Sequence, residues 1–287
     1  MKSTFHIQRN TQTHWVGDGF PVRTLFSYQD DPALFSPFLM LEHAGPTAFE
    51  PTAERRGVGA HPHRGFETVT IVLDGEVSHR DSTGALGSVG PGDVQWMTAG
   101  AGIVHEEFHS EAFARSGGPF HMVQLWVNLP ARDKMTAPGY QSIGVAQIPT
   151  VPLPDGAGTL RLIAGSWLGA QGPARTFTPI QVGDVRLQAG HSVTLPVLDG
   201  HTALALVLQG RVKTADGAQA DASELIGWRR EGAGVMLGAV TDARVLWLAG
   251  EPIDEPVLGH GPFVMNSQAQ IRQALADYQS GRMGRLD

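Results

Sequence analysis

Two pairs of potential metal ligands stand out in this sequence, each with a single residue between its members. His61 and His63 form the first pair, and His105 and Glu107 form the second. In a β-strand, residues two apart project from the same face, so each pair would present its side chains together. Three neutral imidazoles and one carboxylate suit Fe(II) and would also accept Mn, Ni, Cu or Zn. The pattern therefore favours one mononuclear metal site over a scatter of surface histidines.

The composition limits where this protein works and what it binds. The 287 residues carry a net charge of -7 and the pI is near 5.9, so the overall field disfavours direct binding to nucleic acid. There is no cysteine, which excludes disulfides and thiolate metal ligands. The first residues lack the apolar core of a secretory signal, and no run of about 18 apolar residues is present. We therefore expect a globular cytoplasmic protein with no membrane partner.

The segments that must position the ligands have the pattern of strands. Glycine (36 residues) and proline (19 residues) are spread along the chain and suit short strands joined by tight turns. The pattern predicts an all-β, mainly antiparallel fold. The predicted strands cover residues 66–73, 76–80, 94–97, 120–129, 159–165, 179–187, 191–198 and 202–208.

A polar, proline-flanked stretch over residues 130–140 interrupts this pattern and is interpreted as an interdomain linker. Further along, Gly210-Arg211-Val212 follows an apolar run, as Gly75-Glu76-Val77 does earlier in the chain. This echo suggests a duplicated barrel. We expect an N-terminal metal-binding domain over residues 1–132 and a C-terminal domain over residues 133–287.

The C-terminal half differs from the N-terminal half in two respects. Its histidines His191 and His201 have no partner two residues away, so we expect no metal site there. Asn266-Ser267 can cap a short helix over residues 268–278, in which apolar side chains recur every three or four residues.

Longer sequence blocks surround the ligand pairs. They are His61-Pro-His-Arg-Gly-Phe-Glu-Thr-Val-Thr, Gly90-Pro-Gly-Asp-Val-Gln-Trp-Met-Thr-Ala-Gly, Gly102-Ile-Val-His-Glu-Glu, Gln124-Leu-Trp-Val-Asn-Leu-Pro and Gly261-Pro-Phe-Val-Met-Asn. These blocks resemble the pirin family of the cupin superfamily over nearly the whole chain. The resemblance implies a bicupin, two stacked antiparallel jelly-roll β-barrels with one metal in the N-terminal barrel. It also implies that His61, His63, His105 and Glu107 are the four metal ligands.

Other polar residues lie near these motifs. Many cupins take a ligand at a position like that of Glu67, but the pirin pattern uses Glu107 instead, so we expect a supporting or structural role for Glu67. A fifth protein ligand would nearly close the site, so we expect His109 to be peripheral. His121 is interpreted either as a partner of a ligand or as a packing residue. His79 lies near a predicted turn, and we expect it to be solvated.

The resemblance implies quercetin 2,3-dioxygenase activity. In that reaction a flavonol binds through its 3-hydroxyl, dioxygen enters the central ring and carbon monoxide leaves. Glu107 would act as the catalytic residue by accepting the hydroxyl proton, in addition to its role as a ligand. The expected cofactor is one divalent ion, Fe(II) first, and the expected partners are a small aromatic substrate and dioxygen.

A second function, from another class, is left open by the same resemblance. In it the protein is a non-enzymatic, iron-binding, redox-responsive regulator of a transcription factor or a metabolic enzyme. The acidic charge fits a protein partner better than DNA. A regulator predicts partner affinity that differs between Fe(II) and Fe(III), whereas an oxygenase predicts multiple turnovers. In either function we expect a monomer, because a bicupin already packs one barrel against the other.

Overall fold

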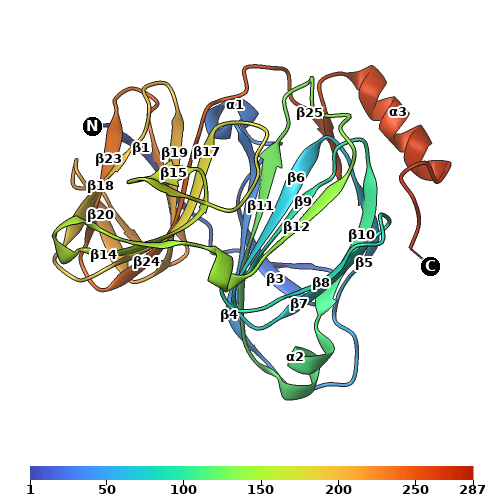
Figure 1. Cartoon of the computed structure of the whole chain (residues 1–287), viewed down its shortest axis with the longest axis horizontal. Coiled ribbons are helices and arrows are strands. Elements are labelled where there is room, and N and C mark those ends of the chain that lie inside the picture. The colour runs from blue at the N-terminus through green and yellow to red at the C-terminus, as the bar shows by residue number, and fades with distance from the viewer. Residues whose placement is uncertain (287) are drawn as a thin grey trace. The chain divides into compact units, whose positions relative to one another are not determined.

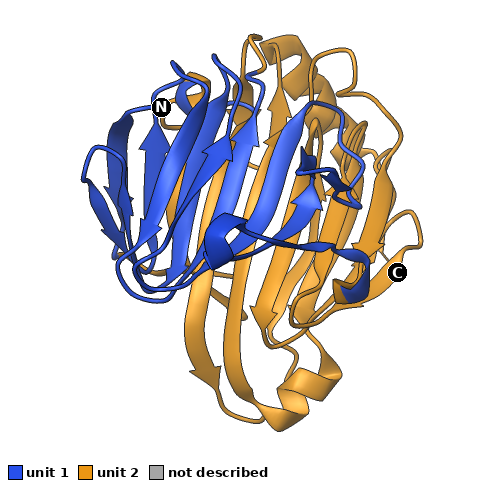
Figure 2. Cartoon of the chain, turned by 60° about the vertical axis from the view of Figure 1, so that its left-hand side comes forward, with its two compact units in different colours: residues 1–11, 34–37, 146–252 blue, residues 12–33, 38–145, 253–287 orange. Residues whose placement is uncertain are grey.

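The computed structural model describes residues 1–286, and its regular secondary structure is mainly β-strand, as predicted (Figure 1). Residue contacts divide the chain into two compact units (Figure 2). Unit 1 contains residues 1–11, 34–37 and 146–252. Unit 2 contains residues 12–33, 38–145 and the described residues from 253 onward.

This division differs from the boundary expected at residues 132 and 133. The first 11 residues belong to unit 1, because the strand Thr4–Arg9 pairs with the strand Glu224–Trp228. The described residues from 253 onward, which include the C-terminal helix, belong to unit 2 with most of the N-terminal half. Long-range strand pairing of this kind leaves no local mark in the sequence.

The interpretation of residues 130–140 as a linker is wrong, because this stretch is part of unit 2. The buried ammonium group of Lys134 donates hydrogen bonds to the carbonyl oxygens of Gly65 and Val264, at 2.7 and 3.0 Å, and to Oδ1 of Asn128 at 2.7 Å. Residues 139–143 then form a strand at the edge of a unit 2 sheet.

Unit 2 contains both predicted ligand pairs and has antiparallel sheets of seven, four and two strands. The seven-stranded sheet has the order β12 (Gly139–Ile143), β9 (Val94–Thr98), β6 (Phe66–Asp74), β11 (Gly118–Asn128), β4 (Phe38–Phe49), β3 (Phe20–Ser27) and β2 (His14–Val16). The four-stranded sheet has the order β5 (Gly57–His63), β10 (Ile103–His109), β7 (Val77–Asp81) and β8 (Leu86–Val89). The third sheet is β25 (Leu258–His260) and β26 (Phe263–Met265).

Unit 1 repeats these sheet sizes, which agrees with the predicted duplication. Its seven-stranded sheet has the order β1 (Thr4–Arg9), β22 (Glu224–Trp228), β19 (Thr202–Gln209), β24 (Ala243–Gly250), β17 (Ile180–Leu187), β14 (Gly158–Ala164) and β13 (Thr150–Pro152). Its smaller sheets are β18 (Ser192–Pro196), β23 (Gly234–Ala239), β20 (Arg211–Thr214) and β21 (Gln219–Asp221), and then β15 (Ser166–Trp167) and β16 (Ala170–Gln171). Gly75 and Gly210 stand at equivalent corners, β6–β7 and β19–β20, with φ of 83° and 79°.

Helices are few and short. The predicted C-terminal helix is α3 (Gln268–Gln279), and the hydroxyl of Ser267 caps it by accepting from the backbone N–H of Gln270. Two helices that the sequence analysis did not predict are α1 (Pro32–Phe35) and α2 (Glu111–Ser116). Single 3-10 turns lie at Val145–Gln147 and Pro154–Gly156. Within residues 1–286, no helix has the length and apolar character needed to cross a membrane.

The C-terminal segment of unit 2 holds the turn between β5 and β6. The guanidinium of Arg64 pairs with Asp277 of α3 at 2.8 Å and donates to the carbonyl oxygen of Ala101 at 2.6 Å. Its side chain is only 5% exposed, so the ion pair is shielded from water. This clamp immediately follows His63 and therefore fixes the end of the strand that carries the first ligand pair.

The turn also depends on Gly65. Its φ is +90°, and a Cβ placed there would lie 2.1 Å from the carbonyl oxygen of Val264. We expect Gly65→Ala to destabilise the protein by about 2 kcal/mol or more, because backbone strain and a backbone clash add. Gly139→Ala is the matched control, since no atom lies within 4 Å of a Cβ at that position. Urea unfolding of both variants measures the effect, and equal midpoints would contradict the prediction.

Candidate metal centre

Antiparallel pairing of β5 and β10 brings the three predicted imidazole ligands together. His61 lies directly opposite His105 in the ladder, and His63 lies opposite Ile103. The ring centroid of His61 is 4.3 Å from that of His105, and the centroid of His63 is 4.9 Å from each of the other two. All three rings offer a nitrogen within 4.8 Å of the others. This distance allows one ion to contact all three.

The protonation state of these imidazoles suits a metal. Burial, followed by the charge of His61, lowers the pKa of His63 and of His105 well below the usual range, so both rings are neutral at pH 7. Nδ1–H of His61 donates to the carbonyl oxygen of Gly59 at 2.8 Å, so Nε2 is the nitrogen of this ring that could bind an ion. Nδ1 of His63 and Nε2 of His105 are buried and have no hydrogen-bond partner among the described residues. Buried nitrogens of this kind fit a bound ion.

Glu107 lies next to His105 but in a second, overlapping group. The β5–β10 ladder is irregular between the two residues, with the extra residue in β5, and Glu107 pairs across the other ladder with His79 of β7. Glu107, His105 and His79 offer ligand atoms within 4.8 Å of one another. Oε1 of Glu107 accepts hydrogen bonds from Nε2 of Gln95 at 2.8 Å and from the hydroxyl of Thr70 at 3.2 Å. The carboxylate is therefore held in a defined position beside His105.

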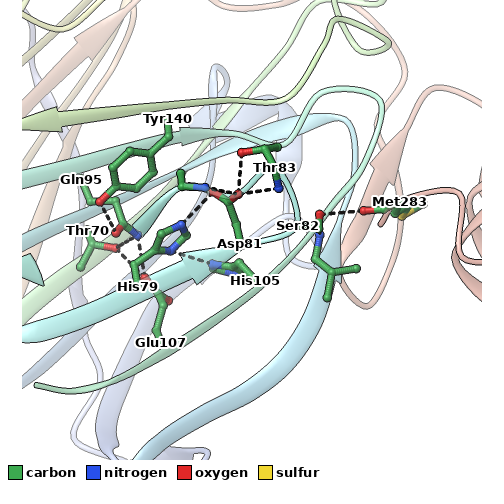
Figure 3. Close-up of polar contacts among 12 residues, drawn as sticks. Thr70, His79, Asp81, Ser82, Thr83, Gln95, His105, Glu107, Tyr140 and Met283 are labelled. Atoms are coloured by element: carbon green, nitrogen blue, oxygen red, sulfur yellow. Dashed lines mark hydrogen bonds and ion pairs between the residues drawn. The ribbon is translucent and has the colours of Figure 1, made fainter. Parts of the chain in front are cut away.

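The expectation that His79 is solvated is wrong. Its side chain is 0% exposed, and its Nε2 lies 3.0 Å from Oδ2 of Asp81. Its Nδ1 lies 3.4 Å from Nδ1 of His105, so the three side chains form a chain of contacts (Figure 3). His79 and Asp81 have the same one-residue spacing as the ligand pairs, and this was the signal in the sequence that could have identified them.

Tyr140 and Gln95 complete the polar surroundings of the site, and the sequence analysis assigned a role to neither. The hydroxyl of Tyr140 donates to Oε1 of Gln95 at 3.2 Å, and its ring stacks on His79 with centroids 4.8 Å apart (Figure 3). Burial, reinforced by the carboxylates of Glu107 and Asp81, raises the pKa of Tyr140 to about 12, so the phenol stays neutral. The amide of Gln95 is thereby oriented with its N–H toward Glu107.

Three other polar residues singled out in the sequence, Glu67, His109 and His121, lie outside both groups of possible ligands among residues 1–286. Glu67 accepts a hydrogen bond from the hydroxyl of Thr98 at 2.7 Å. The ring of His109 donates to the carbonyl oxygen of Gly19 at 2.9 Å. Nε2 of His121 lies 2.7 Å from Nε2 of His43.

Unit 1 has apolar side chains on the strands that correspond to those carrying the predicted ligands in unit 2. Strands β18 and β23 hold the same places in their sheet as β5 and β10 do in theirs. Near the ends of β18 and β23, Leu195 and Val235 face each other in the ladder. Val197 and Leu237 follow, and all four are at most 5% exposed. None of these four side chains can ligate a metal.

Known proteins match both halves of the chain. Residues 19–127 match the pirin family, and residues 182–284 match the pirin C-terminal cupin domain. A Pseudomonas aeruginosa protein named "Putative quercetin 2,3-dioxygenase PA2418" is 54% identical over 282 residues, which is 98% of each chain. The chain belongs to the pirin family. A pirin-like protein of Caulobacter vibrioides is 43% identical over 274 residues, 93% of this pirin and 95% of the relative.

A solved structure supports the fold of this pirin along its whole length. The crystal structure of a quercetin 2,3-dioxygenase from Acinetobacter baumannii has a TM-score of 0.96 and 49% identity, and the match covers 100% of both chains. The predicted bicupin architecture with a short C-terminal helix is therefore confirmed.

Glu67 gives this pirin a testable dependence of stability on pH. Burial raises the pKa of Glu67 to about 7, although the hydrogen bond from Thr98 opposes the shift. Between pH 4.5 and 7 the unfolded chain releases this proton and the folded chain keeps it, so stability falls as the pH rises. We expect Glu67→Gln to remove the loss and to stabilise the metal-free protein at pH 8 by on the order of 3 kcal/mol.

Urea unfolding at pH 5 and pH 8 measures this effect. The matched control is Glu54→Gln, which replaces an exposed glutamate of the same unit. If Glu67→Gln raised the free energy of unfolding by the same amount at both pH values, the raised pKa of Glu67 would be contradicted.

Proposed function

We propose that this pirin is a metal-dependent oxygenase of the quercetin 2,3-dioxygenase type. In this proposal His61, His63, His105 and Glu107 hold one divalent ion, Fe(II) first, with Ni, Cu, Mn and Zn suited to the same donors. The observation that carries the proposal is the convergence of three imidazoles. Two of them, His63 and His105, are neutral, and each has a buried nitrogen with no hydrogen-bond partner among the described residues. The names of the 54% and 49% identical relatives support the choice of reaction.

The substrate class follows from the chemistry of the donors. A bound divalent ion would bind a phenolate or enolate oxygen and lower the pKa of that hydroxyl group. Substrate would approach past His61, which is half-buried, whereas the other three proposed ligands are buried. We propose that a monomer in the cytoplasm acts on a small aromatic, flavonol-like molecule and dioxygen.

Glu107 would take the proton of the substrate hydroxyl. Its carboxylate accepts from both Gln95 and Thr70, and the Thr70 hydroxyl also lies 2.9 Å from Oε1 of Gln124. These donors hold one oxygen, Oε1, so that the other, Oε2, is the atom offered to a proton or an ion. A carboxylate fixed in this way is pre-organised for proton transfer.

The test is aerobic turnover of quercetin by protein loaded separately with Fe(II), Ni(II), Cu(II), Mn(II) and Zn(II). Loss of flavonol absorbance and release of carbon monoxide measure the reaction. We expect multiple turnovers that depend on the metal, and we expect Glu107→Gln to lower kcat by about 100-fold or more, because a positioned base is lost. His191→Gln, at an exposed histidine of unit 1, is the matched control and should retain full activity.

Two results would contradict the proposal in different ways. Stoichiometric metal binding without turnover for any ion would exclude the oxygenase. It would direct the search to a protein partner whose affinity differs between Fe(II) and Fe(III). Failure to bind any of the five ions would exclude the metal site itself.

A further inference from the structure

We propose that Asp81 and His79 are positioning residues that set the tautomer of His105. In this tautomer the hydrogen is on Nδ1 and the lone pair of Nε2 is free to bind a metal ion. The inference rests on the proposed metal site, because it explains how one of its ligands is prepared. Asp81 and His79 lie outside the sequence motifs that contain the proposed ligands.

The chain of hydrogen bonds begins at a carboxylate that only accepts. Oδ1 of Asp81 accepts from the hydroxyl of Thr83 at 2.6 Å and from its backbone N–H at 2.8 Å. Oδ2 of Asp81 lies 3.0 Å from Nε2 of His79. Since a carboxylate has no hydrogen to give, Nε2 of His79 must carry one.

The tautomer of His79 then determines the tautomer of His105. The chain of hydrogen bonds requires the neutral form of His79, in which the ring has one N–H, on Nε2, and Nδ1 is a bare acceptor. That atom lies 3.4 Å from Nδ1 of His105, which must therefore be the donor. Nε2 of His105 is left bare, and it is the buried atom that has no hydrogen-bond partner among residues 1–286. The donor and acceptor roles along the chain thus predict that Nε2 is the nitrogen of His105 that can bind a metal ion.

Packing holds the hydrogen-bonded chain of Asp81, His79 and His105, called the relay below, in place (Figure 3). The ring of His79 stacks on Tyr140 at an interplanar angle of 18°, and Tyr140 also orients Gln95 toward Glu107. Ser82, next to Asp81, accepts from the backbone N–H of Val104 at 3.1 Å and donates to the carbonyl oxygen of Met283 at 2.8 Å. The relay is therefore joined to the strand that carries His105 and to the C-terminal segment.

The decisive variant is Asp81→Asn. The two donors of Thr83 would keep the amide oxygen at the Oδ1 position, so the amide N–H would face Nε2 of His79. Every donor in the chain would then reverse, and His105 would carry its hydrogen on Nε2. The same reversal of an imidazole follows when asparagine replaces the orienting aspartate of a catalytic triad.

Nitrogen-15 NMR of the metal-free protein reads the tautomer directly. We expect the Nδ1–H form of His105 in the wild type and the Nε2–H form in Asp81→Asn, with the signal assigned by its loss in His105→Gln. An Nε2–H form in the wild type would overturn the inference. So would an unchanged tautomer in the variant.

Affinity for Co(II), measured by competition with a chelator, tests whether the tautomer matters for binding. We expect Asp81→Asn to weaken it by about 10–100-fold and to shift the visible Co(II) bands. His79→Phe keeps a ring against Tyr140 but removes the relay, and should also weaken binding. Asp93→Asn is the control, because the Asp93 carboxylate accepts from the backbone N–H groups of Gly90 and Val145 and belongs to neither group of possible ligands among the described residues. Its affinity should be unchanged.

The two readouts separate the inference from the proposed function. A tautomer that switches as expected, in a wild-type protein that binds no Co(II), would overturn the metal site but support the relay. Tight Co(II) binding that neither Asp81→Asn nor His79→Phe weakens would overturn the relay but support the metal site.

Discussion

The antiparallel register between β5 and β10 is the constraint on which the rest of the site depends. It places His61 opposite His105, with His63 two residues further on the same face of β5. A slip of one residue would turn the side chains of one strand to the other face and separate the imidazoles. The turn that follows His63 is anchored by Arg64, which pairs with Asp277, and by Gly65, which packs against Val264. The C-terminal segment thus stabilises the register from outside the two strands.

Burial of several imidazoles and a carboxylate in one barrel is costly unless each polar atom has a partner. The structure meets this demand with short chains of hydrogen bonds. Each chain ends on a group whose role as donor or acceptor is fixed. Asp81 lies at the end of one chain and Tyr140 at the end of another, and these chains reach His105 and Glu107 respectively. Desolvation keeps His63 and His105 neutral, and the hydrogen bonds then decide which nitrogen is bare. Electrostatics and geometry therefore act on the same residues.

The two units show how one architecture can carry different chemistry. Both have a seven-, a four- and a two-stranded sheet. In unit 2 the inward positions of the paired strands are His61 and His105, whereas in unit 1 they are Leu195 and Val235. Exchange of polar for apolar side chains leaves the ladder intact because backbone hydrogen bonds do not depend on side-chain type. The sheets specify the scaffold, and the residues at a few inward positions specify what it can bind.

The sequence by itself determined the features that depend on local pattern. Spacing within one element predicted the strands over residues 66–73 and 202–208 and the capped helix that became α3. The same kind of spacing predicted that His61 and His63 would project together. Only the tertiary structure showed that the first 11 residues complete the sheet of unit 1, that Lys134 is buried in unit 2, and that His79 contacts His105. These facts depend on which distant strands pair and on what their side chains then touch. Periodicity along one strand predicts which face of the sheet a residue lies on. It does not predict which neighbouring residues cover that face.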